Sequence, residues 1–119
     1  MLLKRLKSIA IAAKGIFVLI KEEDNAKVHL LATFLVISLG YFLQLSTSEW
    51  CMIVLCIAGV FSAEAMNTAV ETLTDLVSPE YHLLAGKTKD FAAAAVLLFS
   101  IGAATVGFII FLPKILFFF

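Results

Sequence analysis

The sequence predicts an all-α integral membrane protein, with one amphipathic helix at the membrane surface and three transmembrane helices. Hydrophobic residues make up 62% of its 119 residues, compared with about 45–50% in ordinary globular domains. They form runs of about 18 residues or more, long enough for a helix to cross about 30 Å of hydrocarbon. The length predicts a single domain over residues 1–119. The net charge is zero, so no nucleic-acid partner is expected.

The amino-terminal segment, about residues 1–24, has the pattern of a basic amphipathic helix. Its apolar side chains recur at helical spacing on one face. Its lysines gather on another face: Lys4, Lys7, Lys14 and Lys21. Such a helix lies in the membrane surface, where its lysines are attracted to anionic headgroups.

Three apolar runs predict transmembrane helices over about residues 28–45, 50–76 and 91–112. A charged break precedes the first run, and Asp24 or Asn25 is the expected helix N-cap there. We therefore expect the surface helix to end at this break.

Short polar segments separate the three runs. A turn over residues 46–49 divides the first two, and Pro79 ends the second because proline cannot continue a helix. A polar loop over residues 79–89 is expected next, with Asp90 capping the third run and Pro113 closing it.

The basic residues predict the orientation in the membrane. Residues 1–27 contain six Lys or Arg and the 78–90 loop contains two, whereas the 46–49 turn has none and the tail has only Lys114. Because three spans would place residues 1–27 and the 78–90 loop on one side of the membrane, that side would carry eight basic residues. The other side, with the 46–49 turn and the tail, would carry one. The positive-inside rule places the amino terminus in the cytoplasm and the carboxyl terminus outside the cell membrane.

Four polar residues, Glu64, Asn67, Glu71 and Asp75, follow an apolar run at helical spacing. At roughly 100° per residue they fall within about 80° of one another on one helix face. An ionisable residue in a membrane helix costs about 2.5–3.5 kcal/mol at mid-bilayer, so it indicates function by default. The structural alternative is that Glu64 lies near the headgroups or hydrogen-bonds a neighbouring helix.

Carboxylates and lysines at one membrane face fit a metal–nucleotide ligand. Mg²⁺ takes one or two carboxylates together with phosphate oxygens and waters, and Glu23 and Glu71 are the candidates. Lys87 and Lys89 could neutralise phosphate oxygens, and Glu64 could accept a proton from a lipid alcohol. The alternative for the outer residues is a solvated charged rim.

Two other classes of function remain open at this point. In a small proton or ion transporter, Glu64 would titrate as part of a relay across the membrane. In a structural or regulatory membrane subunit, the carboxylates would dock a basic helix of a partner.

The pattern Glu64-x-x-Asn67-x-x-x-Glu71-x-x-x-Asp75, then Tyr81-His82, then Lys89-Asp90 followed by alanines at 92–95, resembles the bacterial diacylglycerol kinase family. These are small integral membrane lipid kinases, and the resemblance covers essentially the whole chain. Lys21-Glu22-Glu23-x-Asn25-x-x-x-His29 and Phe111-Leu112-Pro113-Lys114 are closer to the Gram-positive branch, whose members act mainly as undecaprenol kinases. Lys4, Ile11 and Ala12 stand where the diacylglycerol branch has an arginine and a tyrosine–serine pair, which also favours undecaprenol over diacylglycerol.

The resemblance implies a homotrimer with composite active sites that take the lipid from the bilayer and MgATP from the cytoplasm. By resemblance, Glu64 is the catalytic base, Asn67 an active-site amide, and Glu23 and Glu71 the Mg²⁺ ligands. The implied ATP-binding residues are Glu23, Glu71, Asp75, Glu80, Tyr81, His82, Lys89 and Asp90, and the expected lipid contacts are Glu64, Asn25 and His29.

Overall fold

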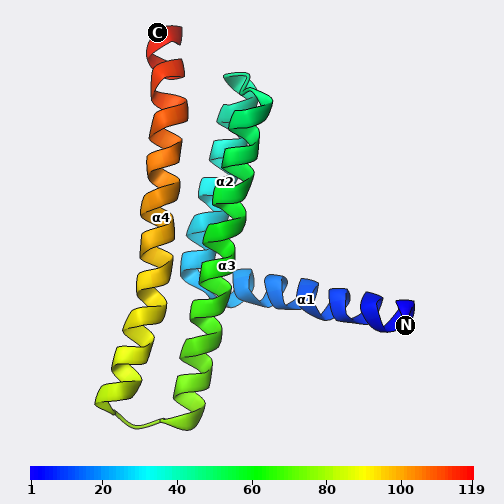
Figure 1. Cartoon of the computed structure of the whole chain (residues 1–119), viewed down its shortest axis with the longest axis vertical. Coiled ribbons are helices and arrows are strands. Elements are labelled where there is room, and N and C mark those ends of the chain that lie inside the picture. The colour runs from blue at the N-terminus through cyan, green and yellow to red at the C-terminus, as the bar shows by residue number, and fades with distance from the viewer.

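Four helices make up the computed structural model, which describes residues 1–119. They are α1 (Leu2–Glu22), α2 (Asp24–Phe42), α3 (Thr47–Val77) and α4 (Leu83–Phe118). Helices α2, α3 and α4 stand side by side, and α1 extends sideways from them (Figure 1). Each of the three upright helices is long and apolar enough to cross a membrane. The all-α fold with three candidate spans is therefore confirmed.

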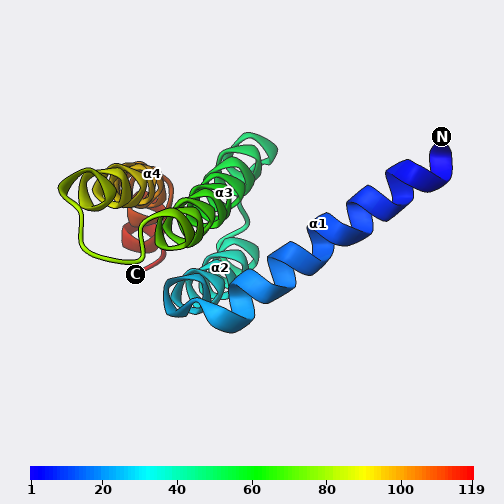
Figure 2. The ribbon, with the colours of Figure 1, turned by 90° about the horizontal axis from the view of Figure 1, so that it is seen from below.

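The break between α1 and α2 is a single residue. Glu23 has an extended backbone (φ −100°, ψ 119°) and is the N-cap of α2, without a side-chain capping bond. The prediction that Asp24 or Asn25 is the N-cap is therefore wrong, because both residues are already helical. Asp24 instead pairs within the first turn, with its Oδ1 3.1 Å from Lys27 Nζ. Figure 2 shows how α1 leaves the three-helix group at this break.

The turn between α2 and α3 lies earlier in the chain than predicted, at residues 43–46. Ser46 and Glu49 form a capping box, in which the Ser46 hydroxyl accepts from Glu49 N and the Glu49 carboxylate accepts from Ser46 N. Two backbone N–H groups at the helix start are thereby satisfied. Helix α3 begins at Thr47, so most of the predicted 46–49 turn is helical, and α3 ends just before Ser78, as predicted.

Helix α4 is longer than predicted at both ends. It begins at Leu83, and the side chain of its N-cap, His82, accepts from Leu84 N at 3.1 Å. Asp90 is therefore inside the helix, and its predicted capping role is wrong. The helix also continues through Pro113 to Phe118. A membrane helix tolerates such a proline when neighbouring helices support it, and Lys114 Nζ lies 3.2 Å from Glu49 Oε2 of α3.

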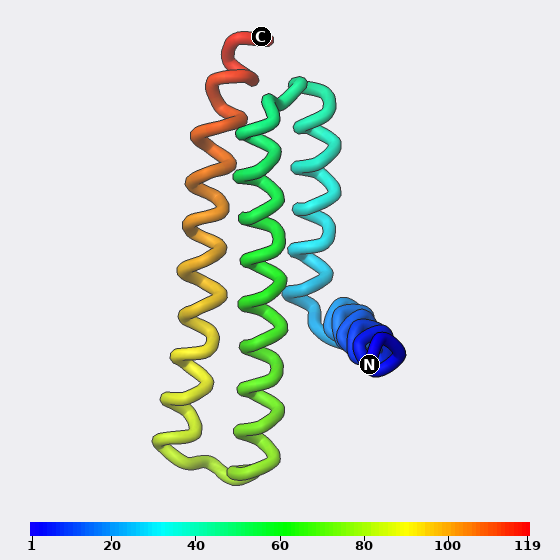
Figure 3. Tube along the Cα trace, turned by 45° about the vertical axis from the view of Figure 1, so that its right-hand side comes forward, coloured from blue at the N-terminus to red at the C-terminus, as the bar shows by residue number.

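Helices α3 and α4 extend beyond the level at which α1 joins the three upright helices. The 31 residues of α3 correspond to a length of about 46 Å, more than the hydrocarbon core of about 30 Å. Its last turns and the first turns of α4 lie on the far side of α1 from the rest of the bundle (Figures 1 and 3).

Few side chains are buried within the single chain. One small apolar cluster, formed by Leu45, Ile53, Ile110 and Phe111, joins α3 and α4 near the α2–α3 turn. Only 10 of 119 residues are buried, and most large apolar side chains are exposed. This distribution suits helices whose outer faces contact lipid or another subunit, because hydrocarbon replaces water around them.

At Gly59, the Phe99 side chain of α4 packs directly against the backbone of α3. A Cβ added at Gly59 would overlap the Phe99 ring of α4, whereas a Cβ at Gly102 would meet no atom within 4 Å. Small residues let membrane helices approach closely. The Phe99 ring thus occupies the space that any larger residue at position 59 would require.

Replacing Gly59 by alanine should lower the stability of the purified protein by about 1–3 kcal/mol, the usual cost of overpacking. The measurement is the midpoint of unfolding in a fixed detergent. Gly102→Ala is the matched control and should be neutral or slightly stabilising, since alanine favours helix by up to about 1 kcal/mol. Equal stabilities of the two variants would contradict the close contact, and adding Phe99→Leu to Gly59→Ala should restore part of the loss.

Candidate active site

Glu64 is the most completely buried large side chain of the protein, with 2% of its surface exposed. Its Oε1 lies 3.3 Å from His29 Nε2 of α2 and has no hydrogen-bond partner. The His29 ring meets Phe61 edge-on, with the ring centroids 6.4 Å apart. The carboxylate is therefore held at the α2–α3 contact beside one imidazole, and one of its oxygens is free to bind a ligand proton.

Asn67 and Glu71 follow Glu64 along the same face of α3. Asn67, 9% exposed, donates from Nδ2 to Glu71 Oε1 at 3.3 Å. This is an i,i+4 pair on a helix surface. The Asn67 Oδ1 is buried without a partner. The amide therefore orients the Glu71 carboxylate and keeps a free acceptor of its own.

The next residue of the face, Asp75, turns toward α4. Its Oδ1 accepts a hydrogen bond from Lys89 Nζ, and both side chains remain partly exposed. This pair joins the last turns of α3 to the first turns of α4. The lysine and the aspartate therefore lie beside the α3–α4 turn, in the part of the bundle that extends beyond α1.

Several predicted nucleotide contacts lie on or next to the α3–α4 turn. Glu80, Tyr81, His82 and Asp90 are exposed, and His82 caps α4. Lys87 lies over the Phe91 ring, with its Nζ 5.7 Å from the ring centroid. The α3–α4 turn and the first turns of α4 thus present mixed charges together with the rings of Tyr81, His82 and Phe91, the groups that triphosphates and bases bind.

Glu23 lines a groove of about 820 Å³ between α1 and α3. The groove is also lined by Thr68 and Thr72, and the buried Thr68 Oγ1 has no partner. Asn25 is exposed in the first turn of α2. Nowhere do three or more His, Cys, Asp or Glu side chains form a group that could hold a metal ion. A metal in this chain would need ligands from substrate, water or another subunit.

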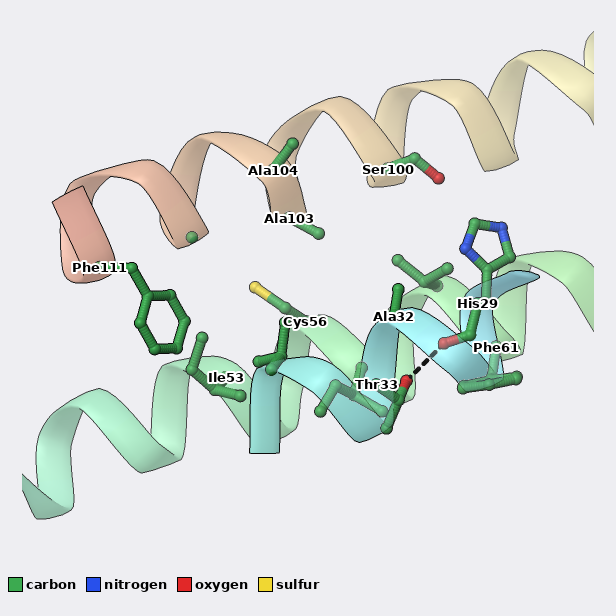
Figure 4. Close-up of a pocket in the computed structure, with 14 residues that line it drawn as sticks. His29, Ala32, Thr33, Ile53, Cys56, Phe61, Ser100, Ala103, Ala104 and Phe111 are labelled. Atoms are coloured by element: carbon green, nitrogen blue, oxygen red, sulfur yellow. Dashed lines mark hydrogen bonds between the residues drawn. The ribbon is translucent and has the colours of Figure 1, made fainter. Parts of the chain in front are cut away.

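An apolar cleft of about 340 Å³ runs between α2, α3 and α4. His29 and Ser100 lie at one end, Ala103 points into it from α4, and Phe111 lies at the other end (Figure 4). The buried Ser100 Oγ has no hydrogen-bond partner. Neither Ser100 nor Thr68 was predicted as a site residue, although a lone hydroxyl within an apolar run was a usable signal for Ser100.

Comparison with known proteins gives concordant matches. The family model described as prokaryotic diacylglycerol kinase matches residues 10–111. An undecaprenol kinase of Bacillus subtilis (strain 168) is 40% identical over 109 residues, which cover 92% of this chain and 89% of that protein. A diacylglycerol kinase of Synechocystis sp. is 35% identical over 112 residues, 93% of this chain and 64% of that protein.

A diacylglycerol kinase of Escherichia coli (strain K12) is 30% identical over 67 residues, 56% of this chain and 55% of that protein. The predicted resemblance is thus confirmed, and the three apolar helices are consistent with it. The chain is a multi-pass membrane protein of the prokaryotic diacylglycerol kinase family.

Proposed function

We propose that this protein transfers the γ-phosphoryl group of ATP to the hydroxyl of undecaprenol and so makes undecaprenyl phosphate. The observation that supports this proposal most directly is the burial of Glu64 beside His29, with its Oε1 lacking a hydrogen-bond partner. Undecaprenol is favoured because the match to the undecaprenol kinase of Bacillus subtilis covers about nine-tenths of both chains. Diacylglycerol is the second candidate acceptor, since other relatives are diacylglycerol kinases.

In the proposed reaction Glu64 is the catalytic base. The lipid hydroxyl loses its proton to the carboxylate while its oxygen attacks the γ-phosphorus in line with the leaving group. The bond from phosphorus to the β–γ bridging oxygen breaks, and ADP leaves. Asn67 is the active-site amide, with its free Oδ1, and Glu64 afterwards releases the proton to water.

The nucleotide would bind where α3 and α4 extend beyond α1. Lys89, held by Asp75, would offset negative charge on the phosphates, because a fixed cation stabilises the transition state. Glu80, Tyr81, His82 and Asp90 are the further ATP contacts proposed, together with Glu23 and Glu71. All are partly or fully exposed, as a site for a soluble nucleotide requires.

Glu23 and Glu71 are the proposed Mg²⁺ ligands. Both are only partly buried, and Glu71 has one oxygen oriented by Asn67. Two carboxylates form a sufficient protein donor set, because Mg²⁺ usually keeps several waters and phosphate oxygens. The ion would supply charge neutralisation at the phosphates when bound.

The arrangement in the membrane is part of the same proposal. The apolar side chains of α1 are exposed almost throughout, as expected of a helix lying in the membrane surface. The amino terminus and the α3–α4 turn would lie in the cytoplasm, with the carboxyl terminus outside. In a homotrimer, a neighbouring subunit would complete the site, which one chain leaves open on the α1 side.

The transporter and the docking subunit are less well supported. Residues 28–45 contain His29 as their only histidine or charged side chain, and it already contacts Glu64, whereas residues 91–112 contain none. A proton path across the membrane would require further titratable steps. The exposed lysine–aspartate pair of Lys89 and Asp75 suits a nucleotide better than a basic partner helix.

Glu64→Gln should abolish lipid phosphorylation, because a carboxamide cannot accept the hydroxyl proton, while binding of MgATP and the fold persist. Activity is measured with labelled ATP, and nucleotide binding by calorimetry. Glu49→Gln, on the same helix but in the first turn, is the control and should retain its kcat. Normal kcat in Glu64→Gln would remove the proposed base.

Glu71→Gln should raise the Mg²⁺ concentration needed for half-maximal activity, since one anionic ligand is lost. The KM for MgATP should rise with it, while the KM for the lipid changes little. The measurement is a Mg²⁺ titration at fixed lipid concentration. An unaltered Mg²⁺ requirement would count against a metal role for Glu71.

Lys89→Met should raise the KM for MgATP by about tenfold, corresponding to about 1.4 kcal/mol of lost binding. Lys114→Met is a matched control, because Lys114 also pairs from α4 to a carboxylate of α3. Lys114 lies at the opposite end of the helix pair and should leave the KM unchanged. Equal effects of both variants would show that the Lys89 pair acts only through stability.

A further inference from the structure

We infer that His29 of α2 carries away the proton that Glu64 takes from the acceptor hydroxyl. This inference rests on the proposed function and deepens it, because it adds an exit for the proton to the base already assigned. In this step His29 acts through Glu64 and not on the reacting phosphorus. It is therefore a positioning residue that relays a proton, and Glu64 remains the base.

The burial of Glu64 creates the need for such an exit. Each transfer of a phosphoryl group to a hydroxyl leaves one proton on the base, and a protonated carboxyl group cannot accept the next one. Only 2% of the Glu64 side chain is exposed, so water has little direct access to it. Repeated turnover therefore requires a neighbouring group that is basic and more exposed than Glu64.

His29 meets both conditions. Its Nε2 lies 3.3 Å from Glu64 Oε1, and 24% of its side chain is exposed. Its ring projects from α2 at one end of the cleft (Figure 4), and the edge-on contact with Phe61 helps to hold it there. A neutral imidazole accepts a proton at one nitrogen and carries another proton on the second. Histidine also changes charge near neutral pH, as a relay requires.

His29 is the only titratable side chain that pairs with Glu64. On α3, Glu71 and Cys56 are seven and eight residues away from the base, which corresponds to about 10–12 Å along the helix. Residues 91–112 of α4 contain no titratable side chain. Of the groups around the base, His29 alone can therefore take the proton directly.

The step balances within the two side chains and water. The O–H bond of protonated Glu64 breaks as an Nε2–H bond forms on His29, which restores the carboxylate and leaves an imidazolium. The imidazolium then loses one proton to water and is neutral again. His29 lies six residues from Glu23, the break between α1 and α2, or about 9 Å along α2. In the proposed membrane arrangement, the aqueous surface is therefore near.

Two substitutions separate a relay from a purely structural contact. In His29→Gln the amide can still donate to Glu64 but cannot carry a proton, so kcat for lipid phosphorylation should fall by at least about tenfold. The KM for MgATP and the midpoint of unfolding should stay as in the wild type. His29→Ala leaves space for free imidazole, which should restore much of the lost kcat. Imidazole should not activate Glu64→Gln, because the base itself is missing there.

The solvent isotope effect is a readout that a structural role would not change. If loss of the proton from Glu64 limits turnover in His29→Gln, the ratio of kcat in H2O to kcat in D2O should exceed that of the wild type. Ser38→Ala is the control, because Ser38 is exposed on α2 and bonds only to the Phe34 carbonyl of its own helix. This variant should match the wild type in kcat and in isotope effect.

Three results would each overturn the relay: an unchanged kcat in His29→Gln, an isotope effect that the substitution leaves unaltered, or no activation of His29→Ala by imidazole. All three would be obtained with an active wild-type kinase, so they would leave the proposed function in place. Failure of the wild-type protein to phosphorylate any lipid alcohol would instead contradict the proposed function, and the relay with it.

Discussion

The burial of the Glu64 carboxylate at the α2–α3 contact is the constraint on which the rest of the structure depends. A buried charge is costly unless it is paired and hydrogen-bonded. Here a single imidazole, His29, lies 3.3 Å away, and Oε1 remains without a hydrogen-bond partner. Such a group destabilises the free protein, and binding of a proton donor at Oε1 would satisfy it. The arrangement therefore favours a ligand with a hydroxyl.

The apolar and the polar parts of the molecule lie on opposite sides of this carboxylate. On one side lie the cleft and the small apolar cluster with Ile53 and Phe111. On the other side lie Asn67, Glu71 and the pair of Asp75 with Lys89. One face of α3 therefore adjoins both kinds of surroundings within a few turns, as the proposed transfer from a nucleoside triphosphate to a lipid alcohol would require.

Most of the fold and part of the site were predictable from the sequence. Runs of apolar residues predicted the three upright helices, and Pro79 correctly marked the end of α3. The 3.6-residue period placed Glu64, Asn67, Glu71 and Asp75 on one face of α3, where Asn67 hydrogen-bonds Glu71. The helices and this face are local features, so propensity and spacing are sufficient to find them, whereas the contacts of Glu64 with His29 and of Asp75 with Lys89 join different helices.

Features that depend on packing were missed. The segment from Leu83 to Lys89 was expected to belong to the polar loop over residues 79–89, but His82 caps it and Lys89 ties it to Asp75, which stabilises it as helix. Pro113 was expected to end α4, but the helix continues through it to Phe118, next to the ion pair of Lys114 with Glu49 of α3. The cleft needs three helices at once, so no stretch of sequence indicates it.

The most direct test of lipid phosphorylation is transfer of labelled γ-phosphate from ATP by the purified protein, with undecaprenol and diacylglycerol offered separately in the same detergent. The account predicts labelled undecaprenyl phosphate in a one-to-one ratio with ADP, and less product with diacylglycerol. Release of ADP without a labelled lipid, or ion flux in liposomes without consumption of ATP, would contradict it.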